Sequence, residues 1–155
     1  MTSATTAGEA ASLGTMRARA VIVGTGFSGL GMAIRLKQRG MHDFVILEKA
    51  DDIGGTWREN TYPGCACDIP SHLYSFSFAP NPRWSRRFSP GSEIRAYLNS
   101  VVDRFDVRRH LRLGQDVTRA EFDEGSGRWQ VATAAGETLE SDVLITACPR
   151  AGCSG

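Results

Sequence analysis

The sequence lacks the features that mark membrane-bound, secreted or nucleic-acid-binding proteins. No apolar run approaches the ~20 residues that span a bilayer. The first fifteen residues, mostly Thr, Ser, Ala and Gly, have neither the basic start nor the apolar run of a secretory signal. Because 18 Lys and Arg stand against 17 Asp and Glu, the net charge is only +1 and attracts neither nucleic acid nor an anionic membrane. We therefore expect a cytoplasmic protein with no nucleic-acid or membrane partner.

Cysteine is scarce and poorly spaced for a zinc site. The four cysteines are Cys65, Cys67, Cys148 and Cys153, in the spacings Cys-x-Cys and Cys-x4-Cys. Structural zinc sites use other spacings, and no histidine lies near enough in the chain to complete a site. In a reducing compartment such thiols stay free and pack against their neighbours. We expect no metal site.

What the sequence does contain is a strand, a glycine turn, a helix and a second strand. Residues 19–23 form a short apolar run of the kind buried in a parallel sheet, and Gly24-Thr25-Gly26-Phe27-Ser28-Gly29 follows at once. Apolar residues then recur at helical spacing up to Gly40, which suits a left-handed helix end. Residues 43–48 read as another buried strand. This βαβ start predicts an α/β fold of Rossmann-like type.

The glycines and the acid at the end of the second strand predict a dinucleotide site. Gly24 permits a tight turn, Gly26 lets a pyrophosphate approach the backbone, and Gly29 lets the helix pack on the strand. The helix N-terminus offers free N–H groups to the phosphates. Glu48 lies where a carboxylate accepts the ribose hydroxyls and disfavours a 2′-phosphate, so FAD or NAD fits better than NADP. The alternative is a glycine-rich turn beside a surface Glu.

The rest of the chain predicts a long aromatic loop, a helix and a meander. Residues 51–90 are punctuated by Gly and Pro and contain seven aromatic residues, so we expect this loop to be held against something large and flat. Ser89-Pro90 predicts a helix start with Ser as the cap, and an apolar stripe continues to about Asp106. Three strands are expected at 116–123, 128–134 and 138–147, the last with a buried Val143-Leu144-Ile145 run.

Longer motifs carry a resemblance to a known family. They are GTGFSGL at 24–30, Glu48-Lys49, Gly-Gly-Thr-Trp at 54–57 and YPG-x3-D-x-P at 62–70. Together these motifs resemble the Baeyer–Villiger monooxygenases and related class B flavin-containing monooxygenases, from about residue 17 to 147. The resemblance implies a Rossmann-like FAD-binding domain over residues 16–147, with a parallel sheet and a three-stranded β-meander.

The resemblance also implies roles for individual residues. The turn of Gly24, Gly26, Phe27, Ser28 and Gly29 would hold the pyrophosphate. Glu48, with Lys49 beside it, would hold the adenosine ribose, and Val117 would contact adenine through its backbone. The remaining implied cofactor-binding residues lie on the flavin side: Gly55, Thr56, Trp57, Asp68 and Tyr74. Trp57 and Tyr74 could instead be core aromatics, and Asp68 could be a turn residue.

The chemistry that the resemblance implies is oxygenation with FAD as cofactor and NADPH as reductant. A ketone would become an ester or lactone, or a nitrogen or sulfur atom of a small organic substrate would be oxygenated. A flavin disulfide oxidoreductase is disfavoured because Trp57 stands where that class has a redox cysteine. A catalytically inert FAD-binding fragment is the other alternative.

The resemblance ends near residue 148. Pro149 stands where the family has a glycine, and residues 148–155 match nothing in it. No second G-x-G-x-x-G follows for NADPH, and no catalytic residue is assigned within the chain. We expect a truncated domain, from a frameshift, a shortened gene or a fragment, with a disordered tail over residues 1–15. Uncovered apolar sheet surface would make such a domain poorly stable or poorly soluble.

Overall fold

A computed structural model describes residues 15–148, so the expected tail and most of the divergent end lie outside the described residues. The strands are β1 (Met16–Val23), β2 (Phe44–Leu47), β3 (Leu111–Arg112), β4 (Val117–Asp123), β5 (Arg128–Thr133) and β6 (Thr138–Thr146). The helices are α1 (Phe27–Gln38), α2 (Thr56–Glu59) and α3 (Gly91–Arg104), with short 3-10 turns at Ser71–Leu73 and Arg108–His110. Within residues 15–148 no helix is long and apolar enough to cross a membrane.

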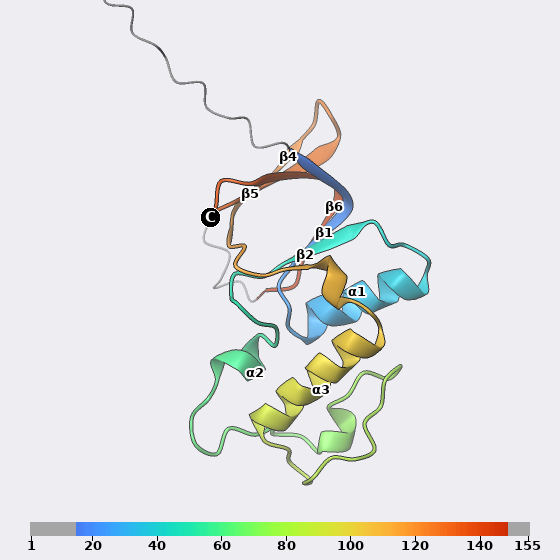
Figure 1. Ribbon diagram of the computed structural model, residues 1–155, viewed down its shortest axis with the longest axis vertical. Helices are drawn as coiled ribbons and strands as arrows, with labels where there is room; N and C mark the ends of the chain where they lie inside the picture. Colours follow the sequence, from blue (N-terminus) through green and yellow to red (C-terminus); the bar gives the residue numbers. More distant parts are fainter. Residues whose placement is uncertain (1–14, 149–155) are drawn as a thin grey trace, which may run out of the picture.

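The strands form one mixed sheet in the order β3-β2-β1-β6-β5-β4. β1 pairs in parallel with β2 on one side and with β6 on the other, and β3 extends the parallel part. β4, β5 and β6 form an antiparallel meander. The α/β class, the βαβ start and the three-stranded meander are therefore confirmed. β6 is both the last strand of the meander and a neighbour of β1, so the meander arches away from the parallel strands (Figure 1).

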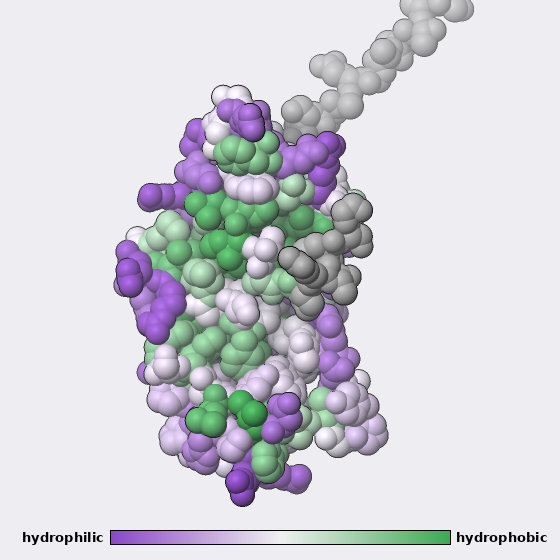
Figure 2. Space-filling view, turned by 180° about the vertical axis from the view of Figure 1, so that it is seen from behind, coloured by the Kyte–Doolittle hydropathy of each residue, from purple (hydrophilic) through white to green (hydrophobic). Residues whose placement is uncertain are grey.

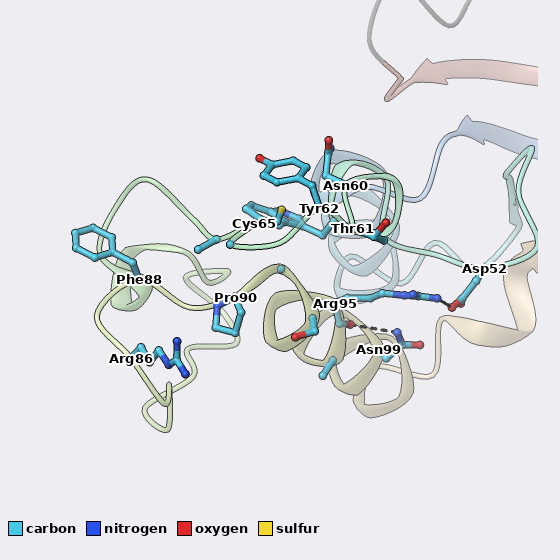
Figure 3. A pocket seen from close by; sticks show the side chains of 16 residues that line it. Asp52, Asn60, Thr61, Tyr62, Cys65, Arg86, Phe88, Pro90, Arg95 and Asn99 are labelled. Carbon is cyan, nitrogen blue, oxygen red and sulfur yellow. Dashed lines mark hydrogen bonds and ion pairs between the residues drawn. The ribbon is translucent and has the colours of Figure 1, made fainter.

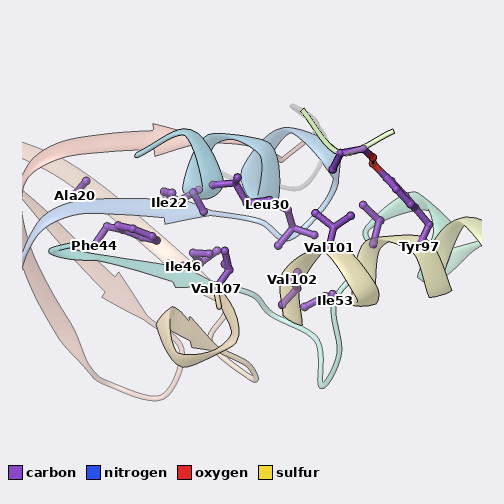
Figure 4. Packing of buried hydrophobic residues seen from close by; sticks show 14 residues of the cluster. Ala20, Ile22, Leu30, Phe44, Ile46, Ile53, Tyr97, Val101, Val102 and Val107 are labelled. Atoms are coloured by element: carbon purple, nitrogen blue, oxygen red, sulfur yellow. The ribbon is translucent and has the colours of Figure 1, made fainter. Parts of the chain in front are cut away.

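Alternate residues of β1 contribute to two separate cores. Ala20 and Ile22 face α1 and α3, whose apolar stripes cover this side of the sheet (Figure 4). Val21 faces the opposite way and packs with Val131 and Leu139 of the meander. This period-2 alternation, buried on both faces, explains why residues 19–23 read as a continuous apolar run.

The long aromatic loop packs on the protein's own helices. A Cβ on Gly31 of α1 would lie 2.8 Å from the Phe76 ring, so this glycine makes room for the aromatic side chain. The Tyr97 hydroxyl of α3 accepts a hydrogen bond from the Phe76 amide and donates one to the Ala79 carbonyl, both at 2.8 Å. The expectation of a large flat partner is therefore wrong for this part of the loop, because α1 and α3 hold it.

The cap expected for α3 is also different. Pro90 is the N-cap residue and no side chain caps the helix. Ser89 is buried instead, and its amide donates to the Ser71 hydroxyl at 2.8 Å. The Ser71 hydroxyl also lies 3.0 Å from the Arg86 carbonyl and 2.9 Å from that of Arg87. The serine expected to cap a helix therefore closes the aromatic loop.

The expected buried run of β6 is wrong. Val143 is 46% exposed, and Leu144 and Ile145 are half-buried. Met16 of the neighbouring β1 is exposed as well. Figure 2 shows one side of the molecule, where hydrophobic side chains gather in the middle and hydrophilic ones lie around them. An apolar run marks a strand that can be buried on both faces, but it does not say what covers it.

The turn between β1 and α1 brings two backbones into contact. A Cβ on Gly29 would lie only 2.0 Å from the Gly24 carbonyl oxygen, so no side chain fits there. Gly24 itself has φ +102°, a conformation that glycine adopts readily. The first turn of α1 is thereby held directly against the end of β1.

We predict that Gly29→Ala lowers the free energy of unfolding by about 3 kcal/mol or more, because backbone must move to admit the methyl group. Chemical denaturation followed by circular dichroism measures this change. Gly26→Ala is the matched control: nothing lies within 4 Å of a Cβ there, so stability should change by less than about 1 kcal/mol. Equal stability of the two variants would contradict this packing.

Candidate dinucleotide site

A cavity of about 720 Å³ opens at the carboxyl ends of β1 and β2. Parallel sheets of this kind bind ligands at that edge. The cavity brings together residues far apart in the sequence. Of the expected cofactor residues it is lined by Gly24, Gly26, Phe27, Ser28, Glu48, Lys49, Gly55, Thr56, Trp57, Tyr74 and Val117.

The glycine turn gives the cavity an open backbone wall. Gly26 is the N-cap residue of α1, which has neither a side-chain cap nor an acidic residue in its first turn. The first N–H groups of this 12-residue helix therefore remain available to an anion, with the partial positive charge of the helix end behind them. The free space around Gly26 is the space that a pyrophosphate needs.

Glu48 lies at the end of β2 as a buried and ordered carboxylate. Its Oε2 accepts hydrogen bonds from the amide and the hydroxyl of Thr25, at 3.0 and 2.5 Å. Its Oε1 accepts one from the Ala50 amide at 3.1 Å and lies 3.2 Å from Nη1 of Arg58. Burial alone would raise the pKa of Glu48, but the hydrogen bonds from Thr25 and Ala50 and the Arg58 charge bring it below its ordinary value. The group is therefore an ionised acceptor at neutral pH.

The other end of the cavity is aromatic. Trp57 donates from Nε1 to the Tyr74 hydroxyl at 3.0 Å, and the two rings meet edge-on with centroids 5.2 Å apart. Burial, with a contribution from the Asp68 charge, raises the pKa of Tyr74. Both aromatics line the cavity, and both pack on the protein: Trp57 lies against the main core and Tyr74 against the Phe27 ring, so the two roles considered from the sequence are compatible here.

Two expected residues do not line the cavity. Gly29 acts through the packing of α1 on β1, as its contact with Gly24 requires. Asp68 is exposed, and its link to the site is its electrostatic effect on Tyr74.

Val117 begins β4 and lines the cavity next to Asp116 and Gln115. The Gln115 amide donates to the Glu48 carbonyl at 2.8 Å, so the start of the meander lies beside the end of β2.

A second hollow of about 730 Å³ lies between α3 and the segment around Tyr62 and Cys65 (Figure 3). Several of its polar groups bind one another. Arg95 forms an ion pair with Asp52, and the Asn99 side-chain amide donates a hydrogen bond to the Arg95 carbonyl at 3.1 Å. Its lining includes Gly64 but no glycine-rich turn between a strand and a helix and no acid at a strand end. The hollow therefore lacks the features that recognise a dinucleotide.

Comparisons with known proteins agree with a dinucleotide site at the carboxyl ends of β1 and β2. Residues 22–89 match a family model described as an NAD(P)-binding Rossmann-like domain. A Baeyer–Villiger monooxygenase of Streptomyces coelicolor is 55% identical over 129 residues, which are 83% of this chain and 25% of the relative. One from Pseudomonas aeruginosa is 45% identical over 128 residues, 83% of this chain and 24% of the relative. The chain thus spans about a quarter of the length of these relatives.

Solved structures give the same result. A steroid monooxygenase bound to NADP matches with a TM-score of 0.81 and 38% identity, over 85% of this chain and 26% of that one. A cyclohexanone monooxygenase from Rhodococcus sp. Phi1 bound to NADP+ matches with a TM-score of 0.82 and 38% identity, over 86% and 26%. The fold and the sequence therefore point to the same group of enzymes.

The cavity contains residues that sequence patterns did not single out. Thr25 and Arg58 both contact Glu48, and Asp116 lies at the adenine end expected from Val117. Thr25 sits inside the glycine motif, but nothing in the sequence indicates that its side chain turns toward Glu48. Arg58 lies ten positions beyond Glu48, and only the fold of the Gly54-Gly55 turn brings the two together.

We predict that Gly26→Val abolishes binding of ADP, the adenosine and diphosphate part of a dinucleotide, without unfolding the chain, because its side chain fills the open space in front of α1. Isothermal titration with ADP measures binding, and circular dichroism checks the fold. The matched control is Gly125→Val, in the exposed turn between β4 and β5 outside the cavity, where the glycine does not have a positive φ. If Gly26→Val binds ADP as tightly as the unchanged chain, the phosphates do not lie at this turn.

Proposed function

We propose that this chain, which is similar in sequence and fold to Baeyer–Villiger monooxygenases, is the FAD-binding portion of an NADPH-dependent flavin monooxygenase. The single observation that supports this most strongly is the cavity that joins the glycine turn, Glu48, the Gly55–Trp57 segment and Val117. Members of this family are oxidoreductases. The proposed reaction is the oxygenation of a ketone to an ester or lactone, or of a nitrogen or sulfur atom.

The residues of the cavity fit an elongated dinucleotide with an anionic centre. The first N–H groups of α1 would bind the pyrophosphate, and Glu48 would accept the ribose hydroxyls. Val117 would contact adenine through its backbone, while Trp57 and Tyr74 would flank the flavin ring. FAD supplies the redox chemistry when bound, and these residues orient it and shield it from water.

Beyond FAD binding, we propose two further partners, a role for Asp68 and a cellular location. NADPH and a small organic substrate are the proposed partners of the longer enzyme. Asp68 would support the flavin side through its effect on Tyr74. A cytoplasmic location is part of the same proposal, since reduced thiols such as that of Cys67 persist there.

A second candidate is a chain that holds FAD without turnover. The observation that favours it is that the second hollow among the described residues lacks a glycine-rich strand-to-helix turn that would hold NADPH. This candidate makes the same FAD-binding prediction as the first. The two differ in NADPH oxidation by the FAD-loaded chain, which absorbance at 340 nm follows.

We predict that the purified chain binds FAD at about one molecule per chain, and that Glu48→Ala weakens binding about ten- to hundredfold, because charged hydrogen bonds to the ribose are lost. Quenching of flavin fluorescence measures the affinity. Glu121→Ala removes an exposed carboxylate of β4 far from the cavity and should leave the affinity unchanged. Absence of FAD binding by the unchanged chain would refute the proposed function.

A further inference from the structure

Arg58 is the cation that faces the ribose-binding carboxylate. It lies on α2, lines the dinucleotide cavity and has a side chain only 12% exposed. Its guanidinium is anchored on two further sides, because Nη1 donates to the Asp52 carbonyl at 2.7 Å and Nη2 to Glu59 at 2.9 Å. A Cβ on Gly54 would lie 3.3 Å from the Arg58 Cβ, so the glycine leaves room for this side chain. Arg58 is therefore fixed in place.

The contact between Arg58 and Glu48 is electrostatic and leaves an acceptor position free. A carboxylate oxygen can accept two hydrogen bonds. Both positions of Oε2 are used by Thr25, whereas Oε1 accepts only the Ala50 amide among the described contacts. Arg58 lies 3.2 Å from Oε1 as an ion pair rather than a directed hydrogen bond. One acceptor position on Oε1 thus remains for an incoming hydroxyl.

The other charged groups near Glu48 have other positions or other ion-pair partners. Lys49 follows Glu48 in the chain and lines the cavity, and Asp116 lines it from the start of the meander. Glu59 forms an ion pair with Arg58 at 2.9 Å. Arg112 of the neighbouring β3 forms an ion pair with Glu137 at 2.9 Å. Burial raises the pKa of Glu48, the hydrogen bonds from Thr25 and Ala50 lower it most, and the charge of Arg58 adds to that lowering.

We propose that Arg58 is a positioning residue for nucleotide binding: it keeps Glu48 charged and directed, so that the free acceptor position of Oε1 receives a ribose hydroxyl. This inference rests on the proposed function. It also links the two ends of the site, since α2 carries Thr56 and Trp57 on the flavin side and Arg58 on the ribose side.

The test is the pH dependence of ADP binding to the full chain, measured by isothermal titration between pH 4 and 8. Binding that needs ionised Glu48 is lost as the pH falls through the pKa of that group. Arg58→Met removes the positive charge, so the pH below which ADP binding is lost should move to a higher value. On this acid limb the variant should bind about tenfold more weakly, and at pH 8 within about threefold of the unchanged chain.

Three further variants separate a positioning role from general damage. Arg58→Lys keeps the charge and should restore most of the acid limb. In a Glu48→Gln background, Arg58→Met should have no further effect on the pH profile. Arg119→Met, on the exposed part of β4, should leave the profile unchanged.

A binding-independent readout is the pKa of Glu48 in the free chain, from carboxyl-carbon NMR. It should be higher in Arg58→Met than in the unchanged chain. An unchanged acid limb, or an unchanged Glu48 pKa, in a folded Arg58→Met variant overturns this proposal while the proposed function stands. Failure of the unchanged chain to bind ADP or FAD at any pH overturns the proposed function and this proposal with it.

Discussion

The close contact between α1 and β1 is the constraint on which the site depends. Because Gly29 has no side chain, the first turn of α1 lies against the Gly24 carbonyl, and the helix N-terminus points across the ends of the parallel strands. That contact places free N–H groups at the same edge of the sheet as Glu48. The proposed anion recognition by the helix end and the proposed ribose recognition by Glu48 would therefore both depend on this one backbone contact.

The rest of the molecule holds this edge in shape. The aromatic loop packs on α1 and α3 through Phe76 and Tyr97, and the hydrogen bonds of Ser71 to Arg87 and Ser89 join the two ends of the loop's later part. The Glu48–Arg58 ion pair closes the shorter loop between β2 and α2. Both devices keep side chains from distant parts of the sequence around one cavity, which is what orientation of a large cofactor requires.

Local patterns predicted the elements well because their causes are local. The βαβ start, the left-handed Gly40 and the meander follow from apolar periodicity and from glycine geometry. Tertiary contacts decided what the patterns missed. Ser89 reads as a helix cap but is drawn into the hydrogen bonds of Ser71, and Val143 reads as buried because composition does not reveal what covers a strand. Arg58 was missed because its partner is set by the fold of the chain between them.

The most direct test of the account is a map of backbone amide chemical shifts on adding FAD to the chain. The largest changes are expected at Gly26, Glu48, Thr56 and Val117, which come from four separate segments around one cavity. Residues such as Arg95 and Asn99, which line the second hollow, should change little. Changes centred on the second hollow, or none at the glycine turn, would contradict the claim that this edge of the sheet is the dinucleotide site.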